Sequence, residues 1–103
     1  MSVIHANKSN FENEVLKSER PVLLDFYASW GGPCRALAPI LDELSAEHPE
    51  IKVVKVDVAA EPELAEAYAV MSIPTLFVIR DGKAVKKTMG AQPKAQLLAL
   101  FEQ

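Results

Sequence analysis

A run of mostly apolar residues from Val22 to Ala28 constrains the fold more than any other feature of the sequence. Apolar side chains occupy both alternating faces of this run, and only Asp25 interrupts it. A strand that is apolar on both faces lies at the centre of a sheet that helices cover on both sides. The run therefore predicts an α/β fold in which this segment is a central strand.

Strand and helix patterns alternate along the rest of the chain. Ser9-Asn10-Phe11-Glu12 has the form of a capping box and predicts the start of the first helix. Pro39 falls inside the longest helical pattern and should kink it, and Asp81-Gly82 predicts a two-residue hairpin turn. The other strands are expected at 3–5, 51–57, 75–80 and 83–89, and the helices from residue 9, from residues 33–34 through residue 44, at 62–68 and at 94–101. The order β-α-β-α-β-α-β-β-α predicts a central mixed sheet flanked by helices.

Length and charge narrow the class of protein. A chain of 103 residues is expected to form a single domain over residues 1–103. A net charge of −3 does not attract nucleic acids or anionic membranes. The first residues do not have the pattern of a signal peptide, and no apolar run approaches the roughly 20 residues of a membrane span. We expect a cytoplasmic monomer that binds neither nucleic acid nor membrane.

Cys34 is the only cysteine, so the chain cannot form an internal disulfide. The two histidines, His5 and His48, lie far from it in the sequence and leave too few ligands for a structural zinc site. Four glycines are too few for the usual phosphate-binding loops. No metal or cofactor is expected, and Cys34 must act alone or with a thiol from another molecule.

The position of Cys34 allows two interpretations. It follows the turn Gly31-Gly32-Pro33 at the start of a helix, where free amides and the helix dipole favour a thiolate over a thiol. Most free cysteines are instead small buried apolar residues. The position alone leaves both a reactive and a structural cysteine open.

Two charged residues fall within expected strands. Asp25 interrupts the central strand, and we expect it to be buried, where a carboxyl usually raises its pKa and stays neutral; the alternative is a residue wetted at the strand end. Lys55 lies between valines in the next strand along the chain and is its natural partner, although a solvated edge lysine is also consistent with the pattern.

Two further features suggest contact with a partner. Pro74 follows Ile73 directly before an expected strand, where trans is the commoner isomer and a cis bond would shape a loop with unpaired backbone groups. Trp30 is a large ring on a glycine-rich turn that little core can cover. It is either a partner-contact residue or a cap on the end of the sheet.

The hexapeptide Trp30-Gly31-Gly32-Pro33-Cys34-Arg35 resembles the Trp-Cys-Gly-Pro-Cys-Lys signature of the thioredoxin family. The resemblance extends along essentially the whole chain. It includes the strand around Asp25, the helix segment Ala38-Pro39-Ile40-Leu41, Lys55, Asp57, the loop Ser72-Ile73-Pro74-Thr75 and the pair Gly90-Ala91.

The resemblance implies a thioredoxin fold and protein-disulfide reduction, with a reductase that draws on NADPH as a partner. In that family the first cysteine of the signature attacks a disulfide and the second resolves the mixed disulfide. Here Gly31 stands at the attacking position and Cys34 at the resolving one. The resemblance also implies that Asp25 helps to move a proton, with Lys55 beside it. It further implies that substrate lies along Trp30, Ile73, Pro74, Gly90 and Ala91, with Pro74 in a cis-proline loop.

A single thiol can form a mixed disulfide, but it must wait for an external thiol to release it. We therefore expect reductase activity to be absent or very weak, with Cys34 still open to capping by a protein thiol or glutathione. A different interpretation is a redox-silent binding module with an apolar platform. A third, less favoured, is a metal or cluster held between two copies by Cys34 of each.

Overall fold

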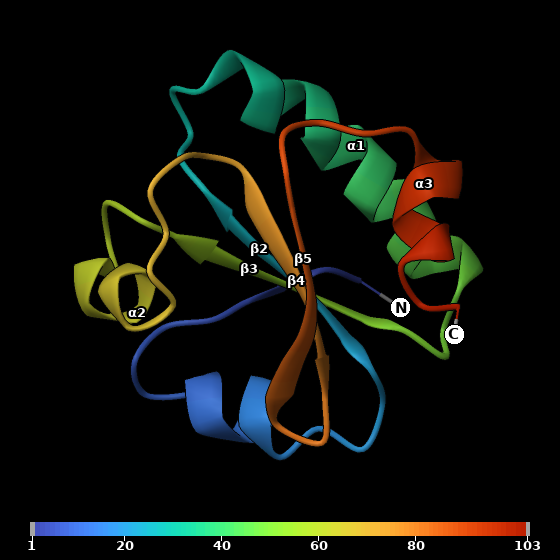
Figure 1. The fold of residues 1–103 in the computed structure, drawn as a ribbon, viewed down its shortest axis with the longest axis horizontal. Helices are drawn as coiled ribbons and strands as arrows, with labels where there is room; N and C mark the ends of the chain where they lie inside the picture. The colour runs from blue at the N-terminus through green and yellow to red at the C-terminus, as the bar shows by residue number, and fades with distance from the viewer. Residues whose placement is uncertain (1, 103) are drawn as a thin grey trace.

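The computed structural model describes residues 2–102, which form a five-stranded mixed sheet with helices on both faces (Figure 1). The strand order is β1-β3-β2-β4-β5. In chain order the elements are β1 (Ile4–His5), the π-helical segment η1 (Glu12–Leu16), β2 (Val22–Tyr27), α1 (Gly32–Glu47), β3 (Lys52–Asp57), α2 (Pro62–Ala67), β4 (Thr75–Arg80), β5 (Lys83–Met89) and α3 (Lys94–Ala99). The α/β fold and the predicted element order are confirmed.

Strand β2 is the central strand that the apolar run predicts. It pairs with β3 in parallel and with β4 in antiparallel orientation, and every residue from Val22 to Phe26 is buried. The hairpin between β4 and β5 turns at Asp81 and Gly82, whose φ angles of 53° and 78° are those that a two-residue turn of the favoured type needs. β1 is a short edge strand, as predicted, and pairs in parallel with β3.

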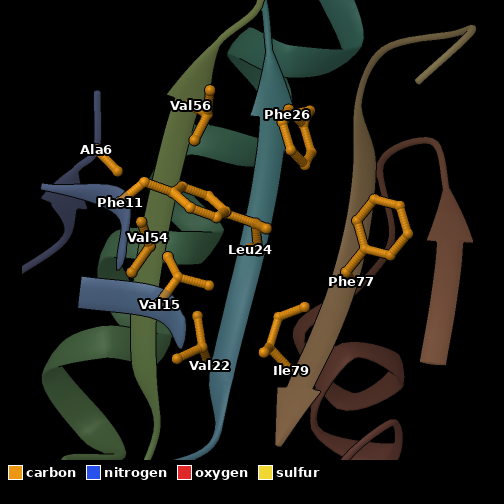
Figure 2. Packing of buried hydrophobic residues seen from close by; sticks show 10 residues of the cluster. All are labelled: Ala6, Phe11, Val15, Val22, Leu24, Phe26, Val54, Val56, Phe77 and Ile79. Atoms are coloured by element: carbon orange, nitrogen blue, oxygen red, sulfur yellow. The ribbon is translucent and has the colours of Figure 1, made fainter. Parts of the chain in front are cut away.

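The two faces of the sheet carry separate clusters of buried side chains. Helices α1 and α3 cover one face, where Leu37, Leu41 and Leu97 pack against residues of β2, β3 and β4. On the other face, Phe11 and Val15 from the N-terminal segment pack against β2 and β3 (Figure 2). Burial on both sides explains why β2 has no polar face.

Aromatic contacts close this second face. The ring centroid of Tyr68, at the end of α2, lies 5.7 Å from that of Phe11, 5.4 Å from that of Phe26 and 5.3 Å from that of Phe77. Because offset and edge-to-face aromatic pairs add to the energy of burial, Tyr68 ties α2 to the sheet and to the N-terminal segment.

The predicted capping box is wrong by two residues. Asn7, rather than Ser9, caps the first helical turn: its Oδ1 accepts hydrogen bonds from the amides of Ser9 at 2.8 Å and Asn10 at 3.1 Å. Asn10 returns the bond, because its Oδ1 accepts from the amide of Asn7 at 2.7 Å. The hydroxyl of Ser9 is itself bonded to Asn7 Oδ1, so it is not free to cap the later turn.

The segment that follows also differs from the α-helix predicted from residue 9. The amide of Phe11 donates to Asn7 in the α-helical pattern, but that of Lys17 donates to Glu12, five residues back, which makes η1 a π-helical turn. The other helices agree with the prediction to within a few residues at their ends, and α1 continues through Pro39. None of the helices within residues 2–102 has the length and apolar character that crossing a bilayer requires.

Substitution of Asn7 tests the corrected cap. We expect Asn7→Ala to lower the free energy of unfolding by about 1 kcal/mol, since it removes the acceptor of two helix amides. Ser9→Ala, the matched control, should cost only a few tenths of a kcal/mol, roughly what a surface substitution costs. Urea denaturation of both variants measures the difference, and a Ser9→Ala cost equal to or above that of Asn7→Ala would restore the original capping box.

Candidate functional site

The turn between β2 and α1 positions Cys34. Gly31 caps α1 in an extended conformation (φ −80°, ψ 126°), and Gly32, Pro33 and Cys34 form the start of the helix. The Gly31 amide donates to the carbonyl of Ala28 at 3.1 Å, and the Gly31 carbonyl accepts from the amide of Arg35 at 3.0 Å. These two bonds hold the turn tightly at the end of the central strand.

Arg35 braces the same turn from outside. Its guanidinium donates a hydrogen bond of 3.0 Å to the carbonyl of Trp30. This bond orients the backbone of the turn, while the Trp30 side chain itself is 65% exposed. Most of the Trp30 surface is therefore open to contact with another molecule.

The sulfur of Cys34 lies close to the position that a side chain at residue 31 would take. A Cβ built on Gly31 would be 3.3 Å from Cys34 Sγ and 3.3 Å from Ile73 Cδ1. Cys34 is only 5% exposed, so the burial that its structural interpretation predicts is present. A side chain at residue 31 would be in tight contact with this sulfur and with Ile73, and glycine avoids that contact.

The loop before β4 lies on the other side of the Cβ position of residue 31, where Ile73 approaches it. The Ile73–Pro74 peptide bond is cis, the isomer implied by the family resemblance rather than the commoner one. The loop is fixed at both ends: Thr75 Oγ1 donates to the carbonyl of Ser72 at 2.5 Å, and the amide of Gly90 donates to the carbonyl of Pro74 at 2.9 Å. Gly90 has a φ of 89°, a conformation that favours glycine.

The structure thus brings together residues from three distant parts of the sequence. Cys34 Sγ and Ile73 Cδ1 both lie within 3.3 Å of the Cβ position of residue 31, and the Pro74–Gly90 bond places the end of β5 at the same loop. Ala91, which follows Gly90, is exposed. Sequence reasoning missed two exposed residues here, Met71 before the loop and Met89 before Gly90. Their only signal in the sequence is adjacency to Ser72-Ile73-Pro74 and to Gly90.

Cys34 also borders a pocket. This pocket has a volume of about 170 Å³ and is lined by Tyr27, Ala28, Ser29, Cys34, Arg35, Ala38 and Lys55. Lys55 extends over the ring of Tyr27, with its ammonium 4.3 Å from the ring centroid. Burial, followed by the charges of Asp57 and Asp25, raises the pKa of Tyr27, so this ring stays neutral at the pocket wall.

Asp25 is buried in the centre of the sheet, as predicted. It is 2% exposed, and its Oδ1 finds no hydrogen-bond partner within residues 2–102. Burial raises its pKa from 3.8 to about 7, and the positive charge of Lys55, which faces it in register on β3, acts in the opposite direction. The carboxyl can therefore hold or release a proton near neutral pH.

The chemistry available at this site is that of one sulfur. Among the residues that the structure describes, no three histidine, cysteine or acidic side chains come together as a metal site. The chain has no second cysteine. The site offers a buried thiol and an apolar rim, and Asp25, which faces the pocket residue Lys55 in register, titrates near neutral pH.

Comparison with known proteins agrees with this geometry. The family model described as thioredoxin matches residues 2–103. The chain is 51% identical over 88 residues to the protein named thioredoxin of Streptomyces clavuligerus, covering 85% of this chain and 82% of the relative. It is 41% identical over 103 residues to thioredoxin C-2 of Corynebacterium nephridii, covering 99% and 95%. It is 46% identical over 99 residues to thioredoxin 1 of Synechococcus elongatus, covering 94% and 92%.

These matches cover nearly the full length of the relatives, and the single Cys34 fits an active site in which the other cysteine is substituted. With the mixed sheet, its flanking helices and the turn that carries Cys34, they establish the family of thiol–disulfide redox proteins to which the chain is related. The protein belongs to the thioredoxin family.

Proposed function

We propose that this protein is a monothiol thioredoxin: Cys34 forms mixed disulfides with protein partners or glutathione but does not complete a reductive cycle by itself. The observation that carries this proposal is the 3.3 Å distance between Cys34 Sγ and the Cβ position at Gly31. In a dithiol this Cβ would carry the second sulfur, whereas here residue 31 is glycine.

The proposed reaction is one thiol–disulfide exchange. The Cys34 sulfur attacks one sulfur of a disulfide, an S–S bond to Cys34 forms, and the other half leaves as a thiolate. Release requires a thiol from outside the chain to attack this mixed disulfide, whereas a resolving thiol within the chain would act at a far higher effective concentration. The mixed disulfide is therefore the long-lived state of this protein.

The surrounding residues support this role. Ile73 lies at the Cβ position of residue 31 next to the sulfur, and the exposed Trp30 lies on the turn that leads to Cys34. We propose that an extended partner chain lies along these residues and Gly90-Ala91, in the manner in which sheet edges bind peptides. We further propose that Asp25 holds the proton that the reaction at Cys34 releases or consumes. The positive charge of Lys55 would favour the ionised form of Asp25.

The partners we propose are protein thiols and disulfides, glutathione as a small thiol, and a thioredoxin reductase that recognises the surface around Trp30. A compartment that keeps thiols reduced, such as the cytoplasm, suits a chain whose one cysteine is unpaired. We propose that it acts there as a monomer.

A second candidate is a binding module that uses the same platform without redox chemistry. The contrast in exposure favours it: Trp30 is 65% exposed, whereas Cys34 is 5% exposed. In this case the platform would hold a partner and Cys34 would be a packing residue.

Oxidised glutathione distinguishes the two candidates. Incubation of the protein should give one adduct per chain in intact-mass analysis, since Cys34 lines the pocket beside Lys55, through which a small reagent can reach the sulfur. Cys34→Ser is the control and should give none. Absence of an adduct on the parent protein would make Cys34 a packing residue and favour the binding module.

Supplying the missing sulfur tests the chemistry directly. Gly31→Cys should raise insulin reduction, assayed with reductase and NADPH, by roughly a thousandfold or more, because the resolving thiol becomes intramolecular. The extended backbone at residue 31 accepts a side chain, and Ile73 Cδ1 is a flexible end that can move slightly.

Two matched variants control for a change of shape and for a misplaced thiol. Gly31→Ser fills the same space without sulfur, and Gly32→Cys places a thiol where a Cβ meets nothing within 4 Å. Neither should approach the rate of Gly31→Cys. Equal rates for the two cysteine variants would show that the position beside Cys34 is not what the reaction requires.

The stability of Asp25→Asn tests the proton-holding role. The folded-state pKa of about 7 lies above the ordinary value of 3.8, so proton binding stabilises the fold fully below pH 3.8 and this contribution is lost as pH rises through 7. The parent protein should therefore lose stability relative to the variant between pH 5 and pH 8.5, by roughly 3 kcal/mol at most.

Chemical denaturation of the parent protein and Asp25→Asn at pH 5 and pH 8.5 measures the difference in their free energies of unfolding. Titrations shared by parent and variant cancel in the comparison, and a constant cost of the buried amide does not change with pH. If the stability difference stays the same from pH 5 to pH 8.5, the carboxyl does not titrate in this range and cannot hold the proton as proposed.

A further inference from the structure

Two methionines border the loop that we assign to partner binding. Met71 is 95% exposed and directly precedes Ser72-Ile73-Pro74, and Met89 is 59% exposed at the end of β5. Met89 is in register with Thr75, which closes the same loop. We propose that Met71 and Met89 are a modification site for peroxides, and that their oxidation to sulfoxides weakens the hold on a partner chain.

One contact ties Met89 to the loop. The hydroxyl of Ser72 donates to Met89 Sδ across 3.4 Å, and the carbonyl of Ser72 accepts from Thr75 Oγ1. Thioether sulfur is a weak acceptor, whereas a sulfoxide oxygen is a strong one. Oxidation of Met89 therefore changes a weak contact at the loop into a strong one and adds a polar group to the rim.

The exposure of both thioethers makes the chemistry accessible. Hydrogen peroxide transfers one oxygen atom to the sulfur: an S–O bond forms, the O–O bond breaks and water leaves. The methionine is oxidised by two electrons and the peroxide is reduced by two. The product is a polar, chiral side chain in place of a flexible apolar one.

The effect on binding follows from desolvation. Methionine adapts its shape to varied apolar partners, whereas a partner that covers a sulfoxide must remove the water bound to its oxygen. The Ser72 hydroxyl can replace that water at Met89, so the cost falls mainly on the Met71 sulfoxide. We expect this to lower the rate of peptide capture about tenfold, a change typical of a polar group buried without a partner. This part of the inference rests on the proposed function, whereas the modification itself does not.

The experiment separates methionine from Cys34. Cys34 is first capped with methyl methanethiosulfonate, the protein is treated with hydrogen peroxide, and the cap is then removed with dithiothreitol, which leaves sulfoxides in place. Peptide mapping by mass spectrometry locates the sulfoxides. Reaction of Cys34 is then measured with oxidised glutathione and with a short extended peptide whose cysteine carries a thionitrobenzoate leaving group.

The double variant Met71→Leu/Met89→Leu is the matched control, since it keeps an apolar rim and Met1 but cannot be oxidised at the loop. We expect peptide mapping to find sulfoxide at Met71 and Met89. Reaction of Cys34 should then be about tenfold slower with the peptide and change less than twofold with glutathione, because only a docked chain desolvates the sulfoxides. Peroxide should not affect either rate in the double variant. Equal slowing of the double variant, or of both probes, would overturn the inference. If untreated Cys34 reacts with neither probe, the proposed function fails, and the mapping alone then decides: unmodified Met71 and Met89 would overturn the inference as well.

Discussion

The pairing of β2 with β3 on one side and β4 on the other is the constraint on which the rest of the structure depends. The strand is covered on both faces, so its residues from Val22 to Phe26 are fully removed from water. The strand delivers the chain to the turn at Gly31, and its neighbour β4 begins directly after Pro74. The positions of Cys34 and of the loop opposite it are thus set by one ladder of hydrogen bonds.

The same burial gives the site its electrostatics. Asp25 on β2 lies opposite Lys55 on β3, and desolvation raises the pKa of Asp25 to about 7. A buried carboxyl without a hydrogen-bond partner for one oxygen costs stability when it ionises. The fold retains it nonetheless, within reach of the charge of a lysine that lines the pocket beside Cys34. The chain thus combines a carboxyl that titrates near neutral pH with glycine at residue 31.

Much of this architecture could be predicted from the sequence, because burial leaves a strong pattern. The two-sided apolar run located β2, and Asp81-Gly82 located the hairpin turn. The helix cap was harder to predict because Asn7 and Ser9 are both suitable capping residues. Only the structure shows that Asn7 Oδ1 accepts hydrogen bonds from the amides of the first turn. The residues left the burial of Cys34 open and favoured a trans Ile73–Pro74 bond, which is wrong because the bond is cis; both features depend on distant segments. Met71 and Met89 were missed because no period or spacing links them; the pairing of β5 with β4 brings Met89 to the loop that Met71 precedes.

We propose that the lone sulfur of Cys34 performs one exchange and then requires an external thiol for release. Counting insulin disulfides cleaved per protein molecule, with the protein fully reduced at the start and no thiol or reductase added, tests this most directly. We expect at most one cleavage per chain, with the insulin fragment remaining attached to Cys34. Several cleavages per chain would contradict it.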